Sequence, residues 1–358
     1  MNNKAVIAMS GGVDSSVAAY LMKQRGFDCI GVTMKLFANE DIGISREHSC
    51  CSLDDVEDAR SVAYSLDMPY YVFNFSDRFE TDVIDRFIHA YENGITPNPC
   101  IDCNRYLKFD KLYMRAKELD RDYVVTGHYA RVEKAGNGRF LLKKALDDTK
   151  DQSYVLYCLT QEQLSHTIFP LGEMRKSQAR EIAESQGFIN ARKADSQDIC
   201  FVQNGSYADF IEQYTGKNYP DGDFLDTNGN VIGRHKGVIR YTVGQRKGLG
   251  ISAPEPLYVK AVNPVSNTVT LSYNDGLYSS VVKAGDINLI SVPEIKGEMR
   301  VKAKVRYRHT EQWATVTQNG DTITAVFDEP QRAVTCGQAL VLYDGDTVVG
   351  GGTIIEVK

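Results

Sequence analysis

The chain has 358 residues, of which 42% are hydrophobic and 25% are charged, and its formal net charge is −6. At about 150 residues per domain, this length predicts two or three domains with proper cores. The composition excludes collagen-like, low-complexity and disordered chains. Eight cysteines are too few for a disulfide scaffold, and no apolar run suits a signal peptide or a membrane span. We therefore expect a cytoplasmic protein with reduced thiols and no membrane partner.

The first 130 residues alternate between short apolar runs and helical stripes. Strands are predicted at 5–9, 29–34, 70–75 and 123–126. Helices are predicted at 16–24, from a capping box at 52–55 to about 66, at 83–91, and from the proline-rich loop 96–100 to about 119. Such repeats predict an α/β domain with an open, mostly parallel, Rossmann-like sheet. Ligands of these sheets bind beyond the carboxyl ends of the strands.

The second half of the chain has a different hydrophobic pattern. Helical character is predicted to continue to about Thr215, and short alternating strands follow Pro220. Four dipeptides favour tight hairpins: Asn228-Gly229, Asp275-Gly276, Asn319-Gly320 and Asp344-Gly345. We predict an α/β domain at 1–205, a small, mainly β central domain at 206–280, and a C-terminal β-barrel-like domain at 281–358.

The segment Ser10–Ser15 (SGGVDS) carries the strongest local signal. It lies between the first predicted strand and the first predicted helix, where backbone N–H groups and the helix dipole favour an anion. Adjacent glycines allow close approach to phosphate, and the hydroxyls of Ser10 and Ser15 add donors. The segment fits neither the Walker A nor the dinucleotide pattern. A plain strand–helix turn is the alternative. The segment resembles the loop of the pyrophosphatase-type (PP-loop) ATP enzymes, which cleave between the α- and β-phosphates.

Two cysteine segments indicate thiol chemistry. Cys100 and Cys103 form a C-x-x-C in the proline-rich loop, and Cys200 lies in the polar stretch 195–201. Reactive thiols need partial exposure and a lowered pKa, which loops near helix starts provide. Cys29, Cys158 and Cys336 are read as small buried hydrophobes. A zinc site built from Cys50, Cys51, Cys100 and Cys103 is a competing interpretation, in which the adjacent pair would chelate awkwardly. Cys50 and Cys51 otherwise receive a structural assignment.

Taken together, these motifs resemble the tRNA-specific 2-thiouridylase family over essentially the whole chain. The matching segments are 8–15, 96–99 with 103–104, 126–131, 150–154, 196–201, 241–250 and 327–330. The resemblance implies a sulfurtransferase that uses ATP with Mg²⁺ to replace the C2 oxygen of the wobble uridine by sulfur. It implies tRNA, bound through its anticodon arm, and a cysteine desulfurase or sulfur-relay protein as partners.

The resemblance also implies roles for individual residues. Cys200 would carry a persulfide, and Cys103 would help to release the sulfur, by forming a disulfide with Cys200 or by acting as the nucleophile. ATP contacts fall on Ala8, Met9, Ser10, Gly11, Gly12, Val13, Asp14, Ser15, Met34 and Gly127. tRNA contacts fall on Asn98, Pro99, Cys100, His128, Lys150, Asp151, Gln152, Arg306, Tyr307 and Gln338. His128 could equally be a hydrogen-bonded histidine at a strand end.

Cys100 departs from the family pattern, in which many members have Asp at this position. An acid/base role of that Asp therefore does not transfer to this chain. Cys100, Cys103 and Cys200 are instead three potential thiolate ligands, which could hold an iron–sulfur cluster with one open iron. Two sulfur routes thus stay open, a persulfide and a cluster.

A basic stripe marks the β half. Arg300, Lys302, Lys304, Arg306 and Arg308 alternate with apolar residues, so period-two geometry predicts all five on one strand face. Such a face favours a polyanion over an ordinary solvated surface. A second basic cluster comprises Arg234, His235, Lys236, Arg240, Arg246 and Lys247.

Two other functions are weighed against thiolation. Another adenylating enzyme, such as an amide-forming ligase, would share the ATP loop but needs no thiol. A non-catalytic RNA-binding protein would need neither an intact Ser10–Ser15 loop nor the two cysteine segments.

Overall fold

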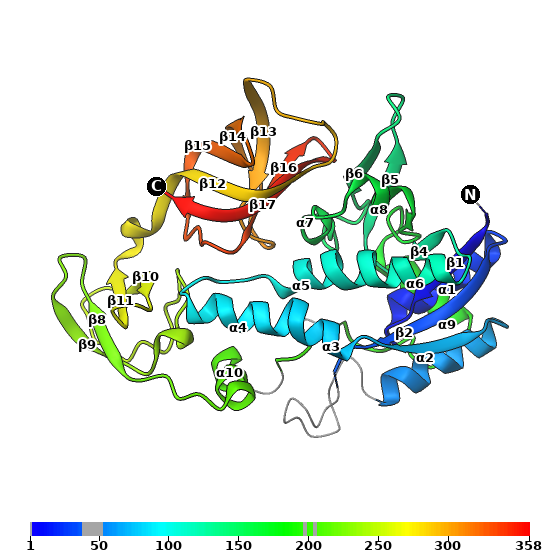
Figure 1. Cartoon of the computed structure of the whole chain (residues 1–358), viewed down its shortest axis with the longest axis horizontal. Helices are drawn as coiled ribbons and strands as arrows, with labels where there is room; N and C mark the ends of the chain where they lie inside the picture. Colours follow the sequence, from blue (N-terminus) through cyan, green and yellow to red (C-terminus); the bar gives the residue numbers. More distant parts are fainter. Residues whose placement is uncertain (1, 38–52, 196–198, 203–205) are drawn as a thin grey trace. The chain divides into compact units, whose positions relative to one another are not determined.

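The computed structural model describes residues 2–37, 53–195, 199–202 and 206–358. The chain divides into two compact units, each built from separate stretches (Figure 1). Unit 1 comprises Met1–Val83, Pro99–Asn204 and Gly345–Val349, and unit 2 comprises Ile84–Asn98, Gly205–Asp344 and Gly350–Lys358. No helix among the described residues is long and apolar enough to cross a membrane.

Unit 1 contains a five-stranded sheet in the order β3-β2-β1-β4-β7, and its neighbouring strands are all parallel. The predicted parallel sheet is therefore confirmed. Its strands are β1 (Lys4–Ala8), β2 (Asp28–Lys35), β3 (Tyr70–Asn74), β4 (Tyr123–Val125) and β7 (Thr167–Ile168). Three longer helices of this unit are α1 (Val13–Gln24), α2 (Leu53–Ser65) and α9 (Lys176–Ser185). The apolar side chains of β1 and α1 lie in one core with those of α2 and α9.

Two further helical stretches contain π-helical turns. The first comprises α3 (Ser76–Phe79), η1 (Glu80–Ile84) and α4 (Asp85–Glu92), so it begins seven residues before the predicted start at 83. The second comprises α5 (Pro99–Asp102), η2 (Cys103–Lys111) and α6 (Leu112–Glu118), which confirms the helix predicted to end near 119. The capping residue proposed for α2, Ser52, lies outside the described residues.

The prediction of helical character from 130 to 215 is wrong in part. A β-hairpin, β5 (Ala130–Lys134) and β6 (Phe140–Lys144), and strand β7 interrupt this region. The hairpin turn contains Asn137-Gly138, and Gly138 has φ +85°, which glycine adopts without strain. The remaining helices are α7 (Ser153–Leu156), α8 (Gln161–Ser165) and α10 (Tyr207–Thr215).

Unit 2 contains two β structures, as the turn signals predict. A four-stranded sheet has the order β10-β11-β8-β9, and six strands in the order β12-β15-β14-β13-β16-β17 close into a barrel through pairing of β12 with β17. The sheet strands are β8 (Gly222–Leu225), β9 (Val231–His235), β10 (Tyr258–Asn263) and β11 (Thr268–Ser272). The barrel strands are β12 (Tyr278–Leu289), β13 (Glu298–Lys304), β14 (Gln312–Asn319), β15 (Thr322–Arg332), β16 (Ala339–Asp344) and β17 (Thr347–Val357).

Three of the four predicted hairpin turns are confirmed. Gly229, Gly320 and Gly345 each have positive φ between paired or consecutive strands. Asp275-Gly276 lies instead in the 3₁₀ helix η4 (Asn274–Leu277), where a Cβ at Gly276 would lie 2.9 Å from the Ser272 side chain. The short helix η3 (Val238–Arg240) completes unit 2.

Candidate functional site

The ATP-loop prediction falls on the turn between β1 and α1. Gly11 has φ +75°, and a Cβ there would lie 2.4 Å from the Asp55 carbonyl oxygen, so only glycine fits. Gly12 has φ −93° and ψ 162°, and a Cβ there would meet only the Ser10 Oγ, at 3.5 Å. The fold thus requires Gly11 to lack a side chain, whereas at Gly12 it leaves space for a ligand.

The two serines of the loop have different roles in this structure. Ser15 Oγ donates to the Gly12 carbonyl at 3.0 Å and lies 3.2 Å from the Ser10 N–H, which donates to it. Ser15 therefore shapes the loop, while Ser10 is exposed. The first turn of α1 follows directly, and its backbone N–H groups have no partners within the helix, which makes it suitable for phosphate.

Gly127, another predicted ATP contact, lies beyond the end of β4. A Cβ at this position would lie 2.7 Å from the carbonyl carbon of Asp14 and 2.8 Å from the backbone nitrogen of Ser15. The absence of a side chain therefore lets the 126–128 segment approach the start of α1. Met34 lies near the end of β2, the strand that pairs with β1.

A charge network that the sequence analysis missed surrounds Asp14. Lys176 Nζ donates to both carboxylate oxygens of Asp14 at 2.7 Å and forms an ion pair with Asp195 at 2.7 Å, although its side chain is only 10% exposed. Tyr129 donates its hydroxyl hydrogen to Asp14 Oδ1 at 2.8 Å. No local motif could have indicated Lys176, because 162 residues separate it from Asp14.

Asp195 is the second carboxylate of this network. It pairs with Lys150 at 2.8 Å and with Arg180 at 3.2 Å, in addition to Lys176. Burial raises the pKa of Asp195, but hydrogen bonds from Lys150 and Lys176 outweigh it and lower the pKa to about 2. Because the pKa is depressed in the folded chain, the network is intact at neutral pH and is lost only as the pH falls towards 2.

The segment 190–195 is also bound to the ATP loop through Asn190 and to helix α2 through Lys193. Asn190 Nδ2 donates to the Gly11 carbonyl and to Ser16 Oγ, both at 2.9 Å. Lys193 Nζ lies 2.6 Å from carboxylate oxygens of Asp55 and Asp58 in α2. The chain that leads to Cys200 is therefore anchored to the loop on which ATP is predicted to bind.

The three candidate thiols have different environments. Cys100 is exposed, Cys200 is half-buried, and Cys103 is buried. The prediction that the C-x-x-C lies in a loop is wrong, because Pro99 begins α5, and proline is favoured in the first turn of a helix. Cys103 opens the π-helical turn η2, and burial raises its pKa, so a thiol and not a thiolate is favoured there.

The remaining cysteines mostly match their structural assignment. Cys29 and Cys158 are buried, and burial raises their pKa values to about 11 and about 12. Cys336 is only half-buried. Cys50 and Cys51 lie outside the described residues. Within the described part of the chain, no three His, Cys, Asp or Glu side chains come together as a metal site, so Cys100, Cys103 and Cys200 do not form a ligand set in this arrangement.

Several predicted tRNA contacts in unit 1 already have protein partners. His128 is buried, shares a 2.7 Å hydrogen bond with Thr126 Oγ1 and packs against the rings of Phe109 and Phe169. Burial lowers its pKa well below the usual value, so the ring is neutral, which favours the alternative of a core histidine. Asp151 accepts hydrogen bonds from the backbone N–H of Ala145 and Ser153, and Gln152 accepts one from Tyr129. Gln152 is thus linked to Asp14 through Tyr129, and Lys150 is linked to it through Asp195 and Lys176.

The proline-rich loop is held by Gln338 within unit 2. The Gln338 side-chain amide donates to the carbonyls of Thr96 and Pro97 at 3.0 and 3.1 Å, and the Thr96 N–H donates to the Cys336 carbonyl. Gln338 therefore fixes the backbone immediately before Asn98 and Pro99, two of the residues predicted to contact tRNA.

The predicted basic stripe is correct only in its first half. Strand β13 ends at Lys304, so the alternation of Arg300, Lys302 and Lys304 is lost beyond it. Arg306 turns towards the protein and donates to the carbonyls of Val243 and Ala333 at 3.0 and 2.6 Å. Its neighbour Tyr307 is exposed. The prediction of five cations on one face is therefore wrong, because a turn replaces the strand.

The second basic cluster is largely neutralised. Arg234 pairs with Asp223, Lys236 with Asp221, and Arg240 with Asp209 and Glu212. His235 is buried and hydrogen-bonded to the Asn267 carbonyl. Arg246 and Lys247 are exposed in the loop before β10. Arg234 and Lys236 are exposed as well but paired, so among the described residues Arg246 and Lys247 are the exposed cations of this cluster without an ion pair.

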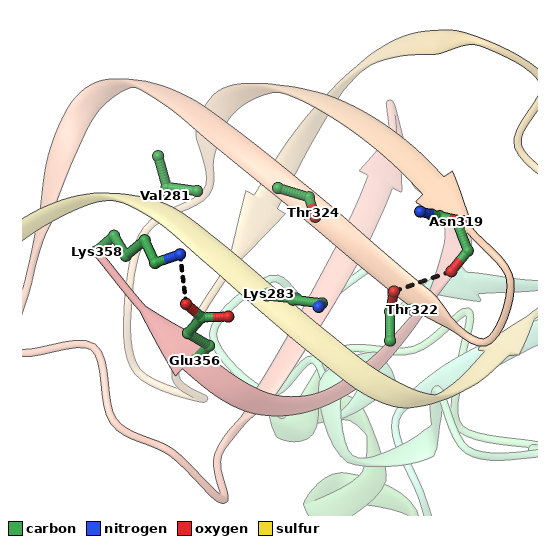
Figure 2. A pocket seen from close by; sticks show the side chains of 7 residues that line it. All are labelled: Val281, Lys283, Asn319, Thr322, Thr324, Glu356 and Lys358. Atoms are coloured by element: carbon green, nitrogen blue, oxygen red, sulfur yellow. Dashed lines mark hydrogen bonds and ion pairs between the residues drawn. The ribbon is translucent and has the colours of Figure 1, made fainter.

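A pocket on the barrel of unit 2 is polar (Figure 2). Figure 2 shows Lys358 paired with Glu356, and Thr322 donating its hydroxyl hydrogen to the Asn319 carbonyl at 2.9 Å. None of its lining residues was predicted as a site residue: Val281, Lys283, Asn319, Thr322, Thr324, Glu356 and Lys358. The pocket lacks a thiol and offers no sulfur chemistry.

Arg306 and Lys302 should behave differently when replaced by alanine. Arg306→Ala removes hydrogen bonds to the Val243 and Ala333 carbonyls and should destabilise the protein by about 1–3 kcal/mol. Lys302→Ala, on the exposed face, should change stability by less than about 0.5 kcal/mol. If Lys302 contacts one phosphate of tRNA, Lys302→Ala should also reduce the slope of the logarithm of the tRNA association constant against the logarithm of the salt concentration by about 0.7–0.9. Thermal denaturation and tRNA binding at several salt concentrations measure both effects, and unchanged stability of Arg306→Ala would contradict the assignment.

Comparison with known protein families agrees with an α/β domain followed by two β domains. Residues 3–204 match a family model described as the tRNA methyl transferase HUP domain, residues 208–273 match a tRNA methyl transferase PRC-barrel domain, and residues 279–354 match an aminomethyltransferase β-barrel domain. The parallel sheet, the SGGVDS loop and the HUP match place the chain in the class of PP-loop enzymes that use ATP.

Curated relatives narrow the class to one family. The chain is 52% identical to the tRNA-specific 2-thiouridylase MnmA of Clostridioides difficile (strain 630) over 356 residues, covering 99% of this chain and 98% of the relative. It is also 52% identical to the MnmA of Lachnoclostridium phytofermentans over 355 residues, covering 99% of each. The chain belongs to the tRNA-specific 2-thiouridylase family. A solved 4-thiouridine synthetase–RNA complex with bound ATP is 19% identical over 59% of this chain and 50% of that chain, at a TM-score of 0.36.

Proposed function

We propose that this chain catalyses ATP-dependent 2-thiolation of the wobble uridine of tRNA. The observation that carries the proposal is the short sequence distance between the charge network of the ATP loop and the thiol of Cys200. Asp195 is bound to Lys176, which holds Asp14 of the ATP loop, and Cys200 follows five residues later. A single unit of the fold thus holds the residues proposed for adenylation and a thiol proposed for sulfur transfer.

The residues of the SGGVDS loop suit the phosphates of ATP. Gly12 leaves space for close approach, and the first turn of α1 offers N–H donors. Mg²⁺ is bound in such sites through one or two carboxylates together with substrate phosphates, and Asp14 offers a carboxylate beside the loop. Bound in this way, Mg²⁺ would neutralise phosphate charge. The Lys176 ammonium, which binds the Asp14 carboxylate in this structure, would then bind the phosphates.

Adenylation turns the C2 oxygen of uridine into a good leaving group. The C2 carbonyl of uridine is a poor electrophile, and its oxygen leaves badly as hydroxide. When this oxygen attacks the α-phosphorus of ATP, pyrophosphate departs and the C2 oxygen becomes part of a stabilised leaving group. Attack by sulfur at C2 then expels AMP, which carries the original oxygen away.

Sulfur transfer is assigned to Cys200 and Cys103. The terminal sulfur of a Cys200 persulfide attacks C2, and the Cys103 thiol releases it by forming a disulfide with Cys200, which balances the two electrons. In a second version, the Cys103 thiol is the nucleophile that attacks the terminal sulfur, so the persulfide moves to Cys103 and Cys200 becomes a thiol. The terminal sulfur then attacks C2, and the Cys200 thiol releases it by forming the same disulfide. Either version requires the buried Cys103 to become accessible, because a thiolate is disfavoured in its present surroundings.

The partners follow from this chemistry. The substrate is tRNA, bound through its anticodon arm, and the persulfide must be supplied by a cysteine desulfurase or a sulfur-relay protein. We propose Asn98, Pro99 and Cys100 as contacts near the target base, with Arg306, Tyr307 and Gln338 as contacts or supports in unit 2. We retain the domain boundaries 1–205, 206–280 and 281–358 as a proposal.

The description of the matched family models as tRNA methyl transferase suggests a second function, methyl transfer to tRNA. Methyl transfer needs neither adenylation nor the Cys103 and Cys200 pair. Nucleoside mass analysis separates the two reactions, because one exchanges oxygen for sulfur and the other adds a methyl group. An amide-forming ligase and a non-catalytic RNA-binding protein would leave tRNA nucleosides unchanged.

Lys176→Met should reduce tRNA-dependent pyrophosphate release by about 10²–10³-fold, because it removes a preorganised cation from the phosphate site. Lys176→Arg should restore part of the rate. A matched control is Lys117→Met, which removes an exposed ion pair with Glu162 and should leave the rate unchanged. A purely structural role for Lys176 predicts a lower melting temperature with kcat unaltered, and that result would contradict the assignment.

A further inference from the structure

The only tryptophan of the chain lies on the outside of the barrel. Trp313 is 49% exposed on β14, while the next residues on the opposite face, Ala314 and Val316, are buried. Directly across the strand pair stands Lys302 of β13. An indole ring buries a large apolar area when it packs against a binding partner, and about half of the Trp313 side-chain surface is still available for such packing.

Cations flank the ring on its own face of the sheet. The Arg300 guanidinium lies 5.3 Å and the Lys302 ammonium 5.6 Å from the Trp313 ring centroid. Arg300 is paired with Asp328, whereas Lys302 has no ion pair within the described residues. Further along β13, the Lys304 ammonium lies 5.8 Å from the ring of Tyr307, which is 38% exposed.

These surroundings favour one kind of partner. An apolar protein surface would have to bury Lys302 and the Arg300–Asp328 pair, which costs free energy without new polar partners. A nucleic acid offers complementary groups to both parts of the surface: bases stack on aromatic rings, and phosphates pair with lysine. Asp328, the acidic residue beside the ring, is already bonded to Arg300, and Glu298 lies at the start of β13.

We propose that Trp313 stacks against an unpaired base of the bound tRNA, with Lys302 contacting an adjacent phosphate. The inference rests on the proposed function and extends it, because it assigns a stacking residue to the barrel. Stacking tolerates any base, since every base has a π-face. Trp313 therefore contributes affinity and position, while recognition of the wobble uridine lies elsewhere.

Because Trp313 is the only tryptophan, the unmodified protein reports on its own interaction. Titration with a transcript of a wobble-uridine tRNA should quench the tryptophan emission and protect it from acrylamide. Trp313→Ala should weaken tRNA binding, measured with end-labelled transcript, by about 5- to 150-fold. Trp313→Phe should recover most of the affinity. Tyr273→Ala removes another aromatic side chain of unit 2, 43% exposed, and should bind tRNA as the wild type does.

The outcomes separate this inference from the proposed function. Labelled tRNA that binds with full affinity while tryptophan emission and the Trp313→Ala affinity stay unchanged would overturn the stacking proposal alone. Absence of tRNA binding to the wild-type chain would overturn the proposed function. Equal loss of affinity in Trp313→Phe and Trp313→Ala would overturn stacking, because phenylalanine retains an aromatic face.

Discussion

Cys200→Ala is expected to abolish sulfur incorporation into tRNA while the protein still releases pyrophosphate from ATP in a tRNA-dependent manner. The ATP loop and its charge network do not include the Cys200 thiol, so the adenylation step should survive. Cys103→Ala should have the same effect. Parallel assays of pyrophosphate and of thiolated transcript measure both steps, with Cys158→Ala, a buried thiol bonded to the Ile101 carbonyl, as the control.

The third thiol distinguishes the two sulfur routes. If a persulfide operates, Cys100→Ala should retain activity, and aerobically purified protein should accept sulfur from a desulfurase without iron. If a cluster operates, removing Cys100 should cost as much as removing Cys103 or Cys200. We favour the persulfide, because the C-x-x-C pattern of Cys100 and Cys103 also serves simple thiol exchange. Stoichiometric iron in anaerobically purified wild type, lost with activity in Cys100→Ala, would reverse that preference.

Gly12→Val is expected to fold normally and to lose ATP-dependent activity almost completely. The backbone of Gly12 is extended, a conformation that valine favours, and a Cβ there meets only Ser10 at 3.5 Å. The added side chain would occupy the space intended for phosphate. Isothermal titration with ATP and thermal denaturation measure the two properties.

Gly11→Ala is the matched contrast one residue earlier. Its positive φ costs an alanine about 1–2 kcal/mol, and the Cβ would collide with the Asp55 carbonyl, so this variant should be destabilised. A folded Gly12→Val protein that binds ATP as tightly as wild type would show that the loop is only a strand–helix turn.

Local patterns predicted the elements that carry the ATP loop. The apolar runs of β1, β2 and β4 and the stripe of α1 are continuous in sequence, and the structure places them within one or two residues of the prediction, except that α1 begins three residues earlier. The hairpin β5–β6 was missed although Asn137-Gly138 carries a turn signal, because the surrounding region was read as helical. Arg306 was misplaced because strand alternation continues in the sequence beyond the point where β13 ends.

The charge network could not be predicted from local patterns. Lys176, Asp195 and Asp14 are isolated residues of common types, and only the fold brings them together. The burial of Cys103 was likewise hidden, since its polar neighbours in sequence suggested exposure, whereas the π-helical turn directs it inward. The pairing of most cations in the second basic cluster also depends on acidic residues up to 31 positions away.

The central claim, that this chain exchanges oxygen for sulfur at the wobble uridine, is tested most directly by mass analysis of tRNA nucleosides. A strain lacking the gene should be complemented with the wild-type chain or with Cys200→Ala. We expect 2-thiolated uridine derivatives to be absent from the deletion strain, restored by the wild type and absent with Cys200→Ala. Thiolated nucleosides persisting in the deletion strain, or restored by Cys200→Ala, would contradict the account.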